Sequence, residues 1–149
     1  MKLASSAFDD GGRIPTRHCG TAENISPEVS FGEVPSAAKE LVLVCFDPDA
    51  SGGWTHWLVY GISPKCDGLP ESLPKRQFVA GAIQGLNSWG ALGWGGPFPP
   101  RGPVHRYLFT LSALSVSLRL EPGRTREKMK SSMQGRVLAE AVLTGIFGR

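Results

Sequence analysis

The sequence contains few cysteines and no long apolar run. Its three cysteines, Cys19, Cys45 and Cys66, are too widely separated to match a disulfide framework or the paired spacing of zinc ligands. We expect them to be reduced packing residues in a cytoplasmic protein. No stretch approaches the roughly 18 apolar residues of a membrane-spanning helix. No long apolar segment follows Met1 either, so we expect neither a secretory signal nor stable membrane insertion.

The sequence also lacks a strong charge bias and several catalytic signatures. Sixteen basic and 13 acidic side chains give a net charge of +3, too small an excess to predict nucleic-acid binding. Neither a Gly-x-Ser-x-Gly elbow nor a His-Glu-x-x-His helix occurs. No internal repeat or linker interrupts the 149 residues, so we expect one domain over residues 1–149.

Glycine and proline, in contrast, are abundant. The 19 glycines and 12 prolines exceed the roughly 12 % of average proteins, which favours many short strands joined by shaped loops. Alternating or continuous apolar patterns predict strands over residues 24–31, 41–46, 56–62, 78–83 and 105–114. The last is the clearest, because His105, Tyr107 and Phe109 alternate with more polar side chains.

The apolar period changes near the end of the chain. A spacing typical of an amphipathic helix is formed by Met133, Val137, Leu138, Ala141, Val142 and Ile146. We therefore predict a helix over residues 133–147, packed on the sheet, and a shorter one over residues 126–132. The elements together predict a mainly β protein, most simply a β-sandwich with a peripheral C-terminal helix.

Two segments repeat one arrangement, in which a Pro/Gly-rich loop delivers a histidine onto a new strand. Residues 46–57 lead to His56, and residues 93–107 lead to His105. Glycine allows unusual backbone angles and proline fixes φ, so such loops hold one shape without regular hydrogen bonds. Loops of this kind often form binding sites. The alternative is a surface turn followed by a histidine with a structural hydrogen bond.

These loops belong to a series of short motifs that runs from about residue 20 to the end. In chain order they are Asn24-Ile25-Ser26-Pro27, Val34-Pro35, Ala38-Lys39-Glu40-Leu41, Asp47-Pro48-Asp49-Ala50, Trp54, His56-Trp57, residues 93–107, Leu138-Ala139-Glu140-Ala141 and Phe147-Gly148-Arg149. In this order and spacing the chain resembles the phosphatidylethanolamine-binding protein family, in particular its bacterial and archaeal Raf-kinase-inhibitor-like branch.

The resemblance implies an antiparallel β-sandwich with a small, pre-formed anion-binding pocket at one end. The pocket positions it implies are Asp47, Asp49, Ala50, Trp54, His56, Trp94, Gly96, Pro99, Pro100, His105 and Tyr107. Members of the family bind phosphate-bearing head groups or similar small anions, and some eukaryotic members inhibit kinases or proteases. Prokaryotic members are often homodimers. The resemblance therefore implies a phosphate- or carboxylate-bearing ligand, a kinase or protease as protein partner, self-association, and no cofactor.

Three residues depart from the family pattern. Ser51 stands where a proline commonly follows Asp-Pro-Asp-Ala, which should loosen that turn. Phe98 occupies a position where a small residue or cysteine is frequent, so its ring should narrow the mouth of the pocket. Trp94 replaces the usual tyrosine and offers an indole donor instead of a hydroxyl.

The residue types suggest how such a pocket would work. A carboxylate beside a histidine favours the imidazolium, so His56 and His105 are the expected anion clamp. Asp47 is expected to orient one of the two imidazoles or to face the ammonium of a zwitterionic head group. Trp54 and Trp94 are expected walls that can contact a ligand ammonium. For Asp49 we expect a turn carboxylate that accepts bonds from nearby backbone amides. Protonated histidines predict that affinity rises as the pH falls through about 6.5.

Two other functions stay open at this point. Asp47, His56 and His105 are also residue types that act as acid, base or zinc ligands in a hydrolase. Alternatively, the pocket is vestigial and the basic segment around Arg124, Arg126 and Lys128 docks an acidic protein partner.

Overall fold

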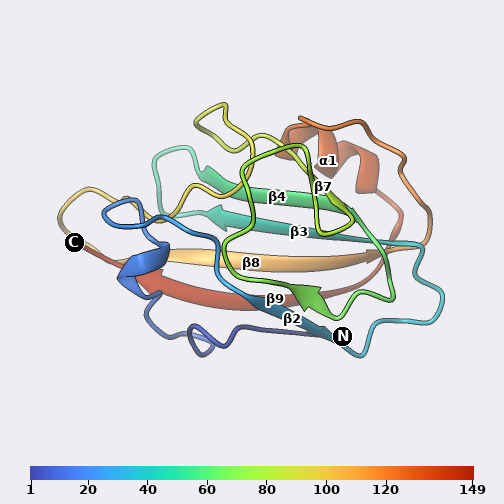
Figure 1. Cartoon of the computed structure of the whole chain (residues 1–149), viewed down its shortest axis with the longest axis horizontal. Helices are drawn as coiled ribbons and strands as arrows, with labels where there is room; N and C mark the ends of the chain where they lie inside the picture. Colours follow the sequence, from blue (N-terminus) through green and yellow to red (C-terminus); the bar gives the residue numbers. More distant parts are fainter.

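The computed structural model describes residues 1–149. Its strands form two antiparallel sheets. The small sheet has the order β1-β2-β5, from Lys2–Ala4, Val29–Gly32 and Gly68–Leu69. The large sheet has the order β6-β7-β4-β3-β8-β9. Its strands are Phe78–Val79, Ala82–Gln84, Trp54–Ile62, Glu40–Asp47, His105–Leu114 and Val137–Phe147. A 3-10 turn, Thr16–His18, and one helix, α1 (Arg126–Met133), complete the chain. The prediction of a mainly β sandwich is confirmed (Figure 1).

The main core lies between the two sheets. Period-two alternation along β8 turns Tyr107, Phe109 and Leu111 inward, as the sequence predicts, where all three are fully buried. From the small sheet, Val29 and Phe31 pack into the same cluster. The predicted strands over residues 41–46, 56–62 and 105–114 are confirmed within β3, β4 and β8.

Helix α1 covers the other face of the large sheet, which explains why β3 is apolar on both faces. Met129 of α1 packs with Val42, Leu58 and Tyr60 in a second, smaller cluster. The helix begins where the Thr125 hydroxyl accepts a hydrogen bond from the Lys128 amide at 3.2 Å. The short helix predicted over residues 126–132 is therefore confirmed.

The helix predicted over residues 133–147 is wrong. The chain turns at Gly135, which has a φ of +75°, and then forms β9, paired with β8 from Val137 opposite Leu114 to Phe147 opposite His105. Apolar residues at helical spacing indicate a helix only where their side chains are buried. Val137, Leu138 and Val142 are in fact 40 %, 45 % and 53 % exposed on an edge strand. The buried positions, Leu143 and Phe147, instead follow the strand period.

Two other predicted strands are shorter than expected. Of the predicted segment 24–31, only residues 29–31 lie in a strand, β2, because Asn24 has a φ of +57° and Pro27 cannot donate. Residues 78–83 form a hairpin of β6 and β7 instead of one strand. Its turn residues Ala80 and Gly81 both have positive φ.

The topology brings both histidine loops to one end of the large sheet. Asp47, the last residue of β3, pairs with Trp54, the first of β4. His105 begins β8 and pairs with Phe147 at the end of β9. This is the end at which the C-terminus lies in Figure 1.

Candidate functional site

Asp47 organises the first histidine loop. It is 2 % exposed, and its Oδ1 accepts hydrogen bonds from the amides of Asp49 at 2.7 Å and Ala50 at 3.0 Å. An aspartate at the start of a turn stabilises it in this way. Gly53 then passes directly over the Phe46 ring with a φ of +73°, where any side chain would collide with that ring. The turn therefore leaves the second carboxylate oxygen of Asp47 free to contact another group.

That group is His105. Its Nδ1 lies 2.7 Å from Asp47 Oδ2, and the histidine side chain is 13 % exposed. Because the carboxylate accepts, Nδ1 carries a proton, and Nε2 is left for another partner. The structure thus shows the orienting contact that the sequence analysis assigned to Asp47.

His56 is held differently, by a backbone carbonyl. Its Nδ1 donates to the Gly95 carbonyl at 2.6 Å, and the Gly95 amide returns a bond to the His56 carbonyl at 2.9 Å. Burial lowers the pKa of His56, outweighing the opposing effects of the Gly95 carbonyl and Asp47. His56 is therefore neutral near pH 7, with a lone pair on Nε2. This differs from the expectation that both histidines are protonated.

A cavity of about 210 Å³, called the histidine cavity below, opens between His56, His105 and Asp47. Its lining is Asp47, Ala50, Trp54, His56, Trp89, Phe98, Pro99, Pro100, His105 and Tyr107. Eight of the 11 pocket positions implied by the family resemblance are in this list. The rings are packed edge to face, with the His56 centroid 5.1 Å from Tyr107 and 5.3 Å from Trp89.

Two buried donors of this lining have no acceptor. The indole Nε1 of Trp54 and the hydroxyl of Tyr107 make no hydrogen bond. Burial, reinforced by the nearby Asp47, raises the pKa of Tyr107, so its hydroxyl keeps its proton. Most buried polar groups in proteins are paired, since an unpaired one costs roughly 1–3 kcal/mol. Two residues that line the cavity thus carry a buried donor that has no acceptor in the free protein.

The other three implied pocket positions lie elsewhere. Asp49 faces Arg106, accepting from its backbone amide at 2.8 Å and from its guanidinium at 2.9 and 3.0 Å. Hydrogen bonds from the Arg106 side chain and amide lower the pKa of Asp49 to about 2. This contact ties the first loop to β8 and replaces the local turn bonds expected of Asp49.

Trp94 and Gly96 line a neighbouring cavity instead. The Trp94 indole is 1 % exposed and donates to the His18 carbonyl at 2.9 Å. The Gly96 amide donates to Asn24 Oδ1 at 2.7 Å. Trp94 is therefore not a wall of the histidine cavity, as the sequence analysis expected.

The aromatic wall that the sequence analysis missed is Trp89. It comes from a third loop, which is fixed to β4 because the Ser88 hydroxyl accepts from the Thr55 amide at 2.8 Å. The Ser88 amide also donates to the Thr55 carbonyl at 2.9 Å. A tryptophan in the Gly-rich segment 85–90 was the available signal. Phe98, predicted to narrow the mouth, does line the cavity.

No group of three or more His, Cys, Asp and Glu side chains is arranged to hold a metal ion. No helix is both long and apolar enough to cross a membrane.

Comparison with known proteins places this architecture in a family. The sequence model of the phosphatidylethanolamine-binding protein family matches residues 4–148. A relative described as a UPF0098 protein from Methanothermobacter thermautotrophicus is 48 % identical and covers 100 % of this chain and 99 % of its own. A second UPF0098 protein, from Aquifex aeolicus, is 42 % identical, covering 100 % and 89 %. The chain belongs to the phosphatidylethanolamine-binding protein family, and these relatives are archaeal and bacterial.

Solved structures agree with the family assignment. A phosphatidylethanolamine-binding protein homologue from Chlamydia trachomatis superposes with a TM-score of 0.90 at 39 % identity, covering 99 % of this chain and 97 % of that one. YbcL of E. coli, described as a member of the mammalian family, gives 0.91 at 26 % identity, covering 99 % and 98 %.

Proposed function

We propose that the 210 Å³ cavity binds a small phosphate-bearing ligand, and that the protein acts by binding rather than turnover. Family membership supports a ligand-binding role in general. The observation that carries the specific proposal is the pair of buried donors, Trp54 Nε1 and the Tyr107 hydroxyl, without acceptors in a cavity lined by both histidines.

The two histidines supply complementary partners for a singly protonated phosphate. His105 as an imidazolium donates from Nδ1 to Asp47 and from Nε2 to a phosphate oxygen, with its charge balanced by the carboxylate. Neutral His56 accepts at Nε2, which suits the hydroxyl of a phosphate that keeps one proton. The second pKa of a phosphate monoester is near 6, so this form is available in mildly acidic solution.

The ligand's protonation therefore sets the direction of the pH dependence. Lowering the pH towards 6 increases the singly protonated, monoanionic form of a phosphate ligand. Affinity for inorganic phosphate is expected to rise over this range. Sulfate has no proton to donate to His56, so it is expected to bind more weakly than phosphate at pH 6.

The biological role proposed is regulatory. The ligand-bound end of the sandwich would contact a kinase or protease in the cytoplasm, where Cys19, Cys45 and Cys66 stay reduced as free thiols.

The protein would act as a homodimer. Sedimentation at micromolar concentration tests the dimer, and a monomer at that concentration would contradict it.

The chain's two tyrosines provide a matched test of ligand binding. Tyr107→Phe removes a hydroxyl that has no partner in the free protein, so the free energy of unfolding should stay the same or rise. Its affinity for inorganic phosphate, measured by isothermal titration calorimetry at pH 6, should fall about tenfold, the equivalent of about 1.4 kcal/mol.

Tyr60→Phe is the control. The Tyr60 hydroxyl donates to the Glu121 carbonyl and accepts from the Arg124 amide at 3.1 Å, far from the cavity. This variant should lose stability and keep its phosphate affinity. Failure of the wild type to bind phosphate, or equal affinity in wild type and Tyr107→Phe, would overturn the proposal.

A further inference from the structure

A second, larger cavity adjoins the histidine cavity. It encloses about 320 Å³, and Trp89 and Phe98 line both cavities. Sites for organic ligands usually occupy about 300–1,000 Å³ and combine apolar walls with a few polar groups. The histidine cavity alone is smaller than this range, whereas the two together fall within it. The shared residues Trp89 and Phe98 place the second cavity beside the first, where a ligand larger than a phosphate group has space for its remaining part.

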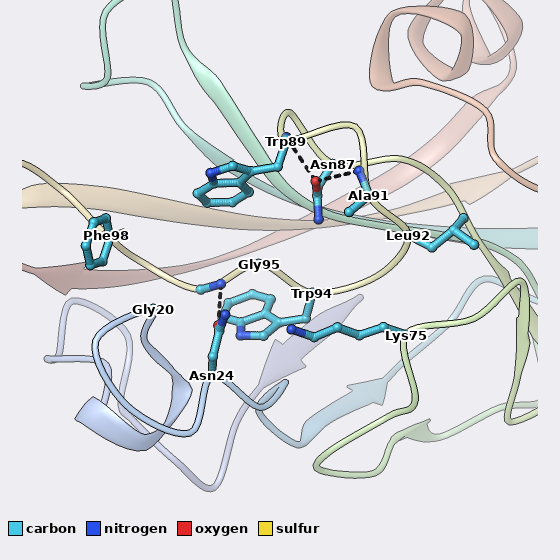
Figure 2. Close-up of a pocket in the computed structure, with 11 residues that line it drawn as sticks. Gly20, Asn24, Lys75, Asn87, Trp89, Ala91, Leu92, Trp94, Gly95 and Phe98 are labelled. Atoms are coloured by element: carbon cyan, nitrogen blue, oxygen red, sulfur yellow. Dashed lines mark hydrogen bonds between the residues drawn. The ribbon is translucent and has the colours of Figure 1, made fainter.

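Three aromatic residues, Trp89, Trp94 and Phe98, contribute to the walls of the second cavity, and of these Trp89 and Phe98 are about half exposed. In Figure 2, Trp89 lies on one side of the chain at Gly95 and Trp94 on the other. Gly95 allows this arrangement, because a Cβ there would lie 2.6 Å from Cζ3 of Trp89. The exposed rings of Trp89 and Phe98, beside the peptide groups of this chain segment, suit a planar organic group.

The free polar groups of this cavity are donors. Asn24 uses Oδ1 to accept from the Gly96 amide at 2.7 Å, which leaves its amide NH₂ to donate. Lys75 is exposed, forms no ion pair, and extends its ammonium group toward Trp94 in Figure 2. Asn87 mainly holds its own loop, since it donates to the Gly93 carbonyl at 3.0 Å and accepts from the amides of Trp89 and Ala91.

No acidic side chain lines the second cavity. Asn24 and Lys75 thus present donors and one positive charge that no neighbouring carboxylate neutralises. A carboxylate at the far end of a ligand would accept from both.

We propose that the second cavity is a subsite for the organic part of the phosphate-bearing ligand, and that it selects an aromatic group carrying a carboxylate. This inference rests on the proposed function, because the phosphate group is placed in the histidine cavity. The ring would contact Trp89 and Phe98, and the carboxylate would meet Lys75 and the Asn24 amide.

Three probes separate the contributions in calorimetric titrations at pH 6: inorganic phosphate, phenyl phosphate and 4-carboxyphenyl phosphate. The wild type should bind them with affinity increasing in that order. Lys75→Met should weaken 4-carboxyphenyl phosphate about three- to fivefold, as expected for a partly exposed ion pair. The same variant should leave inorganic phosphate and phenyl phosphate unchanged.

Lys65→Met is the matched control, because Lys65 is exposed and lines neither cavity. It should bind all three probes like the wild type. Tyr107→Phe should weaken all three by the same factor. That common loss would confirm that the phosphate group occupies the histidine cavity whichever organic group it carries.

The outcomes distinguish the two proposals. If inorganic phosphate binds but the two aryl phosphates bind no more tightly, or if Lys75→Met leaves 4-carboxyphenyl phosphate unchanged, the subsite is refuted and the phosphate site stands. If the wild type binds none of the three probes, the proposed function itself is refuted.

Discussion

The two adjoining cavities are anchored in the same way but differ in chemistry. Asp47 and Asn87 are both buried, and each uses Oδ1 to accept from two amides of the loop that follows it. Asp47 then directs its second oxygen to His105, whereas Asn87 directs its NH₂ to the Gly93 carbonyl. One anchor therefore carries a charge that can support an imidazolium, and the other is neutral.

The difference shows how a β-sandwich divides its work between regular and irregular structure. Asp47, His56 and His105 all lie on strands of the large sheet, whose pairing sets their mutual geometry. The second cavity is built mainly from loops, with Asn24, Lys75 and Trp89 brought in from three separate segments. Strands thus place the histidines and Asp47, while loops supply most of the surface of the second cavity.

The largest expected effect comes from removing the charged anchor. Asp47→Ala would leave the Nδ1–H group of His105 and two loop amides without an acceptor. The free energy of unfolding should therefore fall by about 3–5 kcal/mol. Asn87→Ala should cost about 1–3 kcal/mol, because only neutral hydrogen bonds are lost. Urea unfolding at pH 7 measures both. A larger loss for Asn87→Ala than for Asp47→Ala would show that the two anchors are not distinguished by charge.

A smaller effect tests whether His56 is neutral. Burial lowers the pKa of His56 in the folded state, so the unfolded state binds the proton more readily as the pH falls through about 6.5. Stability should therefore decrease below that pH, by at most about 1.4 kcal/mol per pH unit. Urea unfolding at pH 7.5 and 5.5 measures the change.

His56→Gln provides the comparison for the pH experiment, because glutamine does not titrate. The variant should show a smaller loss of stability between pH 7.5 and 5.5 than the wild type. Equal losses of stability in the two proteins would mean that the buried imidazole does not resist protonation. The proposed role of His56 Nε2 as an acceptor would then be contradicted.

The sequence predicted the strand framework well, because β3, β4 and β8 carry strong local patterns. It also predicted that two distant histidine loops form one cavity beside Asp47. It misassigned residues 133–147, because an exposed edge strand can carry apolar side chains at helical spacing. The spacing of apolar residues indicates the type of secondary structure only when those apolar side chains are the buried ones.

The missed parts of the site depend on contacts between distant segments. Trp89 enters the cavity because Ser88 pairs with Thr55, and Asp49 turns away from it because Arg106 lies opposite. Trp94 belongs to the second cavity because its indole reaches His18, 76 residues away in the sequence. No local pattern encodes these pairings, although each of the three residues stands out as an aromatic or charged side chain in a Gly- or Pro-rich loop.

The most direct measurement follows the four tryptophan indole resonances by ¹H–¹⁵N NMR during a phosphate titration at pH 6, with assignments from a Trp54→Phe variant. The indoles of Trp57 and Trp94 already donate to Gln84 and His18, so their resonances should stay in place. The Trp54 indole, which has no acceptor in the free protein, should shift downfield and saturate with the phosphate concentration. A Trp54 resonance that does not move at saturating phosphate would contradict the account.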